Sequence, residues 1–446
     1  MGNTGLVFGR DGAAPFMNPA TILAVEDEQL AFSVNFYTFT AFSGRNWYQP
    51  GPIDRARFGN VATGKTTLTD LEFNALPSSL CLFLPSWKRT RLAFCLANTQ
   101  ASSFSFNAEH YDARGSDGRL TQQSQTMLMS YGRFLFGPTW AIELSDHFTV
   151  GVSLHGSLVA HRSVMDASAS TFGGASAPIT SVFYNASRGD SAQLSAVVGA
   201  TYRAEGYRLA LSIESPSLHV YGIGAANRHT QFEGAGASTQ STAIEGRFVS
   251  PTPLRVGIGA GIIGARASVE LNFLYYTAMS AGYRADLSGN TVTVEGGVAR
   301  EETVDLRLSR RADSVLNASL GGQYFLYPSL SILGGVSTDF TAVPAGELRG
   351  DLFNYYPTRS QRLAASIGLG SHGEGGELLV GTELSMAFGQ RVAINSYQLP
   401  PTYGIANYTS FVALFVVAGS TSLKAIKRAV LDAADALKAP KALPKR

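Results

Sequence analysis

The feature of this sequence that most constrains its fold is an apolar residue at every second position, repeated in segment after segment of the chain. Side chains of a β-strand point alternately to opposite faces, so this period predicts strands with one apolar and one polar face. Residues 148–160 show it well, with an apolar set and a polar set in alternation: Phe148, Val150, Val152, Leu154 and Leu158 against Thr149, Ser153, His155 and Ser157. The chain is therefore predicted to be all-β.

The connections between these segments indicate how the strands are arranged. We predict strands at 29–42, 78–85, 90–106, 122–144, 147–163, 189–203, 206–222, 238–261, 264–284, 312–326, 329–342, 358–371, 376–389 and 405–419. The connections alternate along the chain between long (43–77, 107–121, 164–188, 223–237, 285–311, 343–357, 390–404) and short, such as 145–147 and 204–205. An even strand number with long loops on one side and tight turns on the other is typical of a bacterial outer-membrane barrel.

Composition agrees with a transmembrane antiparallel β-barrel of about fourteen strands. Charged residues make up only 15% of the chain and the mean hydropathy is +0.05. A spanning helix needs about 20 apolar residues in a row, and the densest run, 411–419, is less than half as long, so helical spanning is excluded. The net charge of +2 comes from scattered Lys and Arg, which points to no nucleic-acid partner.

The chain divides into three parts. Residues 1–28 are too short for a domain and too irregular for a strand, and we expect them to fold into the barrel, which occupies 29–419, as a plug. The tail, 420–446, has a helical pattern that Ser422 can cap. We expect it to be either a solvated periplasmic extension or a helix that lies on a surface or binds a partner. Both termini then lie on the turn side, in the periplasm. Met1–Gly5 carries no signal-peptide features, so we expect the true beginning to differ from Met1.

Two glycine-rich motifs resemble nucleotide sites. Residues 59–66 match the phosphate-loop pattern, but they follow a polar, proline-containing segment instead of a buried strand. Residues 259–264 match the dinucleotide fingerprint, but the following segment alternates with period two where that fold needs a helix, so we interpret them as a turn between strands. The seven histidines have no metal-ligand spacing and no Gly-x-Ser-x-Gly elbow is present, so we expect no cofactor, no metal and no enzymatic activity.

Cys81 and Cys95 are the only cysteines, and they flank the turn around Lys88 symmetrically. One interpretation is two small apolar residues. The other is a disulfide across a hairpin, which an oxidising compartment such as the periplasm permits.

A short N-terminal motif carries a family resemblance. Residues 11–20, which end in Asn18-Pro19-Ala20, resemble the start of the FadL-type outer-membrane transporters of long-chain fatty acids and aromatic hydrocarbons. Further similarity lies in 75–79, 136–154 and 207–217, so the likeness covers about 5–419. It implies a hatch inside a fourteen-stranded barrel, capture of the ligand outside, and release sideways into the membrane after the hatch moves. The sequence departs from the family in three ways: no leader is visible, the segment before the hatch is shortened, and a tail follows the last strand.

The resemblance implies a passive, hatch-gated outer-membrane transporter of small hydrophobic molecules in a Gram-negative bacterium, surrounded by lipid and lipopolysaccharide. Phe16, Asn18, Pro19 and Ala20 would belong to the hatch and ligand pathway, with Asn18 bonding its own backbone in a turn. Their phase on the strands places Arg208, Arg255 and Arg362 in the lumen, either as contacts for a ligand carboxylate or in salt bridges with Glu214, Glu270 or Glu383. The alternative is a polar-solute porin or a structural barrel.

Overall fold

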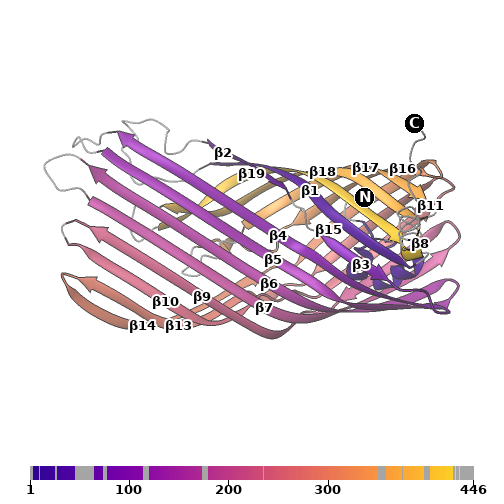
Figure 1. Ribbon diagram of the computed structural model, residues 1–446, viewed down its shortest axis with the longest axis horizontal. Helices are drawn as coiled ribbons and strands as arrows, with labels where there is room; N and C mark the ends of the chain where they lie inside the picture. The colour runs from indigo at the N-terminus through magenta and orange to yellow at the C-terminus, as the bar shows by residue number, and fades with distance from the viewer. Residues whose placement is uncertain are drawn as a thin grey trace, which may run out of the picture.

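The chain forms a closed, tilted β-barrel (Figure 1). The computed structural model describes residues 4–9, 11–25, 28–45, 65–73, 78–113, 120–172, 179–234, 236–349, 358–373, 375–395, 402–424, 427 and 431. Over these residues the strands belong to one antiparallel sheet, whose first strand β1 (Gln29–Arg45) pairs with its last strand β19 (Thr402–Ser422). This pairing closes the cylinder, because neither β1 nor β19 is left as an unpaired edge strand.

Each pass of the chain across the wall pairs with the next pass along the chain. The strands after β1 are β2 (Lys65–Phe73), β3 (Ser79–Phe83), β4 (Thr90–Ala113), β5 (Leu120–Ser145), β6 (Phe148–Phe172), β7 (Ile179–Ala204), β8 (Tyr207–Glu214), β9 (Leu218–Glu233), β10 (Ser238–Val249), β11 (Arg255–Ile263), β12 (Ala267–Tyr276), β13 (Met279–Glu295), β14 (Val298–Ala312), β15 (Val315–Tyr327), β16 (Leu330–Phe340), β17 (Thr358–Gly373) and β18 (Gly376–Asn395). Several wall passes are interrupted and so appear as two strands, for example β8 and β9, which both pair with β7. The described wall therefore has fourteen passes, as the alternation predicted.

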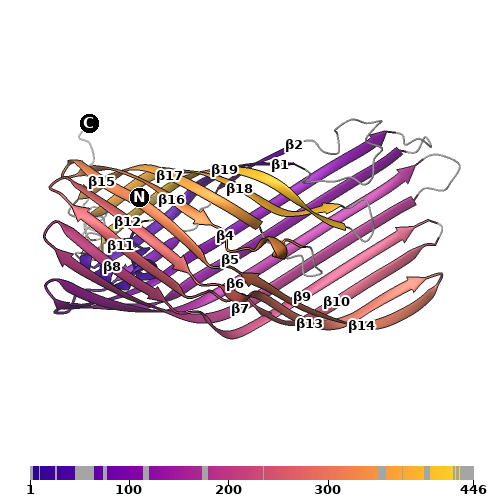
Figure 2. The same cartoon turned by 180° about the vertical axis from the view of Figure 1, so that it is seen from behind.

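The two ends of the barrel differ (Figure 2). At the turn end, tight turns such as 205–206 and 328–329 join the strands, and Gln29 of β1 pairs there with Ser422 of β19. At the opposite, loop end, β4 to β7 run on for 24 to 26 residues each.

Four predicted long connections are mostly strand. Most of 107–121, 164–188 and 223–237 continues the neighbouring strands, and 285–311 forms the hairpin of β13 and β14 around Gly296 and Gly297. The prediction was wrong because these residues are polar on both faces, as in Arg300-Glu301-Glu302-Thr303. Backbone pairing continues there beyond the point where apolar alternation ends, so a pattern based on side chains stops too early.

The wall is apolar outside and polar inside. Leu154 and Leu158 of β6 are more than half exposed on the outer face, whereas His155 and Ser157 are buried in the lumen, as the alternation predicted. The outer belt includes Phe94, Phe134, Leu194, Leu211, Ile258, Phe273, Leu320, Val336, Leu363, Ile367 and Leu384. Near the turn end it carries aromatic side chains, among them Trp87, Trp140, Tyr207 and Tyr327. An apolar band with aromatic residues at its border matches the hydrocarbon layer of a membrane and its interface.

Helical structure is scarce. The described helices comprise α1 (Ala14–Met17), the 3-10 turns η1 (Pro19–Ala24) and η3 (Ala345–Glu347), and the helical residues 423, 424, 427 and 431 of the tail. No helix among the described residues is long and apolar enough to cross a membrane.

Two sequence predictions fall largely outside the described residues. Of the predicted tail, residues 420–422 complete β19, and most of the expected helix, including 432–446, is not described. Of the phosphate-loop-like motif, 59–64 is not described, and Lys65 and Thr66 begin β2.

Candidate functional site

The N-terminal segment, residues 4–9 and 11–25, lies inside the barrel at its turn end (Figure 1). Its helix η1 packs against the inner faces of β4, β5, β6 and β7. Leu6, Ala20 and Ile22 are fully buried there. Burial of each large aliphatic side chain contributes about 1.5–3 kcal/mol, so the segment is packed as an integral part of the interior.

The Asn18-Pro19-Ala20 motif forms a tight turn. Asn18 is fully buried, and its side-chain oxygen accepts a hydrogen bond from the Ala20 N–H at 3.1 Å, which is the self-bonding predicted from the sequence. Its side-chain amide donates to the carbonyl of Leu6 at 2.7 Å. Pro19 occupies the first position of η1, where its missing N–H costs nothing. One side chain thus joins two turns of the N-terminal segment.

Two glycines of the wall make room for this turn. Gly151 of β6 and Gly199 of β7 are cross-strand partners. A Cβ on Gly199 would overlap the side-chain oxygen of Asn18, and one on Gly151 would lie 2.6 Å from the carbonyl carbon of Pro19. The backbone of the segment therefore touches the backbone of the wall, which only glycine permits.

The glycines of β11 have the same role. A Cβ on Gly261 would lie 2.5 Å from the ring of Phe8, and one on Gly259 would lie 2.8 Å from a methyl group of Val7. Gly264 lies in the turn from β11 to β12, as interpreted from the sequence, whereas Gly259 and Gly261 belong to β11 itself. The spacing that resembles a dinucleotide fingerprint is thus explained by close packing of the segment.

Glu270 of β12 anchors the start of the segment. It is buried, and its carboxylate accepts hydrogen bonds from the N–H groups of Gly5 at 2.9 Å, Val7 at 3.0 Å and Phe8 at 3.2 Å. Asn272 donates a fourth at 2.7 Å. The sequence suggested Glu270 as a salt-bridge partner of a lumen arginine, whereas its described partners are mainly backbone N–H groups. Charge-assisted bonds of this kind are the stronger ones.

The three predicted lumen arginines lie at different places. Arg255 of β11 forms an ion pair of 3.0 Å with Glu214 of β8 and donates to the carbonyl oxygen of Phe16 at 2.6 Å. The guanidinium of Arg208 lies over the ring of Phe8, 5.4 Å from its centre. Arg362 of β17 pairs in register with Asp339 of β16 and is not among the residues that line the chamber described next. Arg255 is thus the one of the three that joins the segment to that chamber.

A chamber of about 660 Å³ lies beside the N-terminal segment in the lumen. Phe16, Met17 and Arg255 line it, together with wall residues that include Ser33, Asn98, Thr99, Arg133, Leu135, His155, Ser157, Ser195, Glu214, Leu274, Tyr276, Ser319, Ser337 and Thr338. Most of these side chains are polar. The ring of His155 lies 4.8 Å from that of Phe16, and neither of its nitrogens has a hydrogen-bond partner among the described residues.

A smaller cavity of about 170 Å³ shares Thr4 and Asp11 with the chamber. It lies between the N-terminal segment and the wall, with Phe8 on one side and Phe325, Leu333, His372 and Leu379 on the other. The segment therefore leaves space along this part of the wall.

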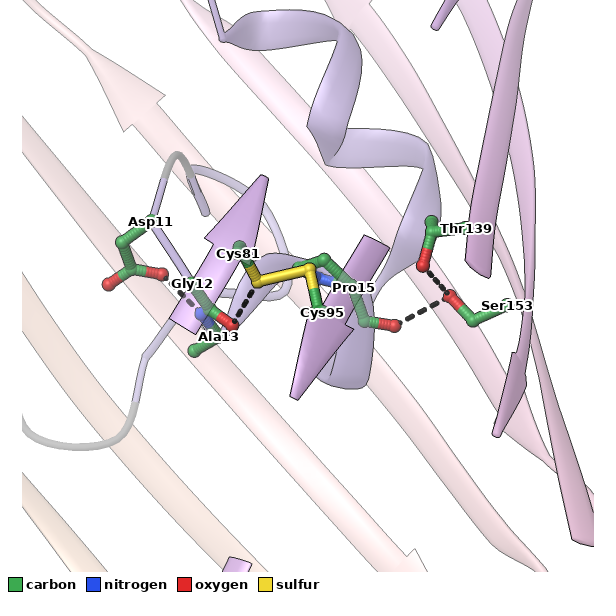
Figure 3. The surroundings of a disulfide bond; sticks show 8 residues. All are labelled: Asp11, Gly12, Ala13, Pro15, Cys81, Cys95, Thr139 and Ser153. Atoms are coloured by element: carbon green, nitrogen blue, oxygen red, sulfur yellow. Dashed lines mark hydrogen bonds between the residues drawn. A yellow bond between two sulfur atoms is a disulfide. The ribbon is translucent and has the colours of Figure 1, made fainter. Parts of the chain in front are cut away.

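Cys81 of β3 and Cys95 of β4 form a disulfide, which decides between the two interpretations left open by the sequence (Figure 3). Both residues are fully buried, and the Sγ of Cys81 lies 3.2 Å from the carbonyl oxygen of Gly12. On the other side of the segment, Ser153 donates to the carbonyl of Pro15 at 2.8 Å. Strand β3 has only five residues, so the covalent bond secures a short part of the wall against which the segment rests.

Comparisons with known proteins agree with this architecture. No family model matches the sequence, and no curated protein matches it either. Among solved structures, the toluene transporter TodX of Pseudomonas putida matches with a TM-score of 0.55 at 12% identity, over 94% of this chain and 98% of that one. The CymD monoaromatic hydrocarbon channel matches with a TM-score of 0.51 at 12% identity, over 94% and 95% of the two chains. A Pseudomonas aeruginosa FadL homologue matches with a TM-score of 0.51 at 14% identity, over 95% and 96%.

The chain has a FadL-type barrel fold.

In this FadL-type barrel the wall, the N-terminal segment and the chamber lie against one another. The described residues contain no group of three or more His, Cys, Asp and Glu side chains placed to hold a metal ion. The wall supplies hydrogen bonds to the carbonyls and N–H groups of the N-terminal segment, and the chamber borders the same segment. A molecule in the chamber would therefore contact both the wall and the segment.

Proposed function

We propose that this protein is a passive outer-membrane transporter of small hydrophobic molecules, in which residues 1–28 act as a hatch. The observation that carries the proposal is a closed barrel with an apolar belt whose lumen holds its own N-terminal segment beside a chamber. The similar solved structures are described as toluene transporters and hydrocarbon channels, which supports the same class of solute. The loop end would face outward amid lipopolysaccharide, and the turn end and both termini would face the periplasm.

The polar lining of the chamber favours, within this class, a solute with one polar group. A long-chain fatty acid fits this lining better than a pure hydrocarbon does. The polar side chains can form hydrogen bonds that replace the hydration its carboxylate loses on entry. Arg255 is the best-placed contact, and the ring nitrogens of His155 offer a second. We place no ligand contact on Arg208, whose guanidinium lies over the ring of Phe8, or on Arg362, because neither is among the residues that line the chamber.

The contacts of Arg255 would couple solute binding to the hatch. Its guanidinium has a limited set of donors, and one of them now bonds the Phe16 carbonyl. A solute carboxylate in the chamber would compete with Glu214 and Phe16 for those donors. Phe16, Asn18, Pro19 and Ala20 would then move as one unit, since Asn18 holds their turn together.

Conductance in planar lipid bilayers tests the hatch. The intact protein is expected to pass almost no ions, because the N-terminal segment occupies the turn end of the lumen. A variant without residues 4–25 is expected to pass measurably more ions than the intact protein. Porin-like currents through the intact protein would reject the hatch and favour the polar-solute alternative.

Uptake by cells tests the solute. Cells that carry the protein should take up radiolabelled oleate faster than cells with an empty vector, and Arg255→Ala should reduce that uptake while Arg255→Lys retains part of it. Arg311→Ala, which alters an exposed arginine of β14, serves as the control. Equal uptake of oleate with and without the protein would exclude fatty acids as solutes, and toluene would then be the next solute tested.

A further inference from the structure

The segment that follows β16 turns into the lumen near the loop end. Residues 341–349 leave the wall after Phe340 and form the short turn η3. Leu348 is buried, and Val343 is partly buried against the same interior cluster. This stretch, here named the inward segment, thus lies in the interior at the other side of the chamber from the N-terminal segment.

A buried arginine holds the inward segment. Arg310 of β14 is only 3% exposed, and it donates to the carbonyl oxygens of Glu347 at 3.2 Å and Arg349 at 2.9 Å. It also lies 3.5 Å from the carboxylate of Glu347. A guanidinium that is nearly excluded from water must keep such partners, because a buried charge without them is costly. Arg310 therefore ties the segment to the wall through two carbonyl oxygens and one ion pair.

Leu348 fills an apolar cluster that spans the lumen. The cluster, here named the loop-end cluster, also contains Phe42 of β1, Met127 of β5, Met165 of β6, Phe183 of β7 and Tyr408 of β19. The rings of Phe42 and Tyr408 stack at 5.0 Å, and Met129 packs against the cluster. β1 and β19 are neighbours in the wall and β5, β6 and β7 form a second neighbouring group, so the cluster joins two parts of the wall across the lumen.

Methionine and aromatic side chains suit this position. Unbranched thioether side chains repack easily around apolar groups of different shape, and such surfaces accept varied partners. Leu348 is attached to a short turn and not to a strand, so it can leave without any loss of wall pairing. The space that Leu348 vacates is lined by apolar side chains and suits an alkyl or aryl group.

We propose that the inward segment is a second closure of the lumen, latched by Arg310, and that Leu348 occupies the place an apolar solute takes when it enters. The idea rests on the proposed function for its solute, but not for its geometry. The lumen is then closed on both sides of the chamber, by the N-terminal segment at the turn end and by the inward segment nearer the loop end.

Cysteine accessibility tests this closure. Both native cysteines are in the disulfide, and the described residues contain no free thiol. Ser337→Cys places a thiol in the lining of the chamber, and a charged, membrane-impermeant methanethiosulfonate reagent is added to intact cells. With the inward segment in place we expect slow labelling. Arg310→Ala and, independently, Leu348→Ala should each speed it by roughly tenfold or more, since each removes a contact that holds the segment.

Controls separate this proposal from the function. Arg311→Ala, the exposed neighbour of Arg310, should leave labelling of Ser337→Cys slow. Glu295→Cys, at the exposed tip of the β13–β14 hairpin, should label at once and confirms that the loop end faces outward. Slower migration after heating on a gel shows that each variant is folded. Because labelling requires no transported molecule, failure of oleate uptake leaves this result intact.

Two results would overturn the proposal. One is rapid labelling of Ser337→Cys when no other residue is changed. The other is slow labelling that persists in folded Arg310→Ala and Leu348→Ala. Addition of toluene to the cells should speed labelling of Ser337→Cys in the otherwise unchanged protein, because the solute displaces Leu348. An unchanged rate at saturating toluene would refute the part of the proposal in which Leu348 stands in the place of the solute.

Discussion

At the scale of single residues, Glu270 makes several hydrogen bonds to the N-terminal segment that no motif in the sequence indicates. Its two carboxylate oxygens accept three backbone N–H groups, from Gly5, Val7 and Phe8. A buried N–H without a partner costs about 1–3 kcal/mol. The position of residues 5–8 therefore depends on one side chain that lies 265 residues away from Gly5.

Glu270→Gln should loosen the start of the segment. A carboxamide has one oxygen acceptor and directs its NH2 group toward other donors, so at least one N–H among residues 5–8 loses its partner. Hydrogen exchange of these amides should accelerate by roughly tenfold or more, the equivalent of about 1.4 kcal/mol or above. Glu302→Gln changes an exposed glutamate of β14 and should leave the exchange rates unaltered. Equal protection of residues 5–8 in both variants would show that Glu270 is dispensable.

These residues differ in how far the sequence could place them. The alternation predicts correctly that Glu270, Arg255 and His155 point inward, because that depends only on the strand they occupy. Asn18 was recognised by a short motif, and its bond to Ala20 is local. Glu214, one of the glutamates suggested by the sequence as a partner of a lumen arginine, does form the ion pair with Arg255. The backbone partners of Glu270 and Arg255 in residues 5–16 lie in a segment without periodicity, more than 200 residues away, and no local pattern contains that information.

At the scale of strands and turns, the sequence predicts the membrane-embedded part of the wall and underestimates the rest. All fourteen passes are found, yet β6 ends at Phe172 instead of 163 and β13 at Glu295 instead of 284. In β1, a bulge between Asn35 and Tyr37 shifts the alternation by one, so that Tyr37 and Phe39 face outward. Such shifts preserve pairing while they reset which residues face the lumen.

Strand β3 provides the test at this scale. Replacement of both Cys81 and Cys95 by serine removes a cross-link between residues 14 apart, which contributes about 3 kcal/mol in the loop-entropy view. We expect the double variant to fold and to unfold at a lower denaturant concentration, as measured by tryptophan fluorescence in detergent. The intact protein should be about 2 Da lighter than the sum of its reduced residues, a check on the disulfide itself. Identical unfolding midpoints would mean that packing alone holds β3.

At the scale of the whole molecule, the distribution of apolar and charged side chains is the reverse of that in a soluble protein. Large apolar side chains cover the outside, and Arg91, Arg133, Glu270 and Arg391 are buried within. Composition allowed this reading but could not separate it from a secreted all-β protein. The sequence could not predict all that fills the lumen. The three-dimensional structure was needed to place the inward segment nearer one end and the N-terminal segment at the other.

A pair of arginine substitutions tests which face meets lipid. Leu154→Arg places a charge on the outer face of β6, which costs about 2–4 kcal/mol near the middle of a bilayer. Ser195→Arg places the same charge in the polar lining of the chamber, where we expect a smaller effect. Urea titration of folding into phospholipid vesicles measures both. If Ser195→Arg destabilises the barrel more than Leu154→Arg does, the assignment of the two faces is wrong.

The junction of β1 with β19 has a consequence for how the protein is made. Residues 29–45 are synthesised well before their hydrogen-bonding partners, 407–422, so the ring cannot shut until β19 has been made. Until release, the first strand carries a bare row of N–H and C=O groups that invites pairing with other chains. The nascent polypeptide must therefore be shielded until its end arrives, and loss of even the final strand should leave an aggregating ribbon in place of a smaller pore.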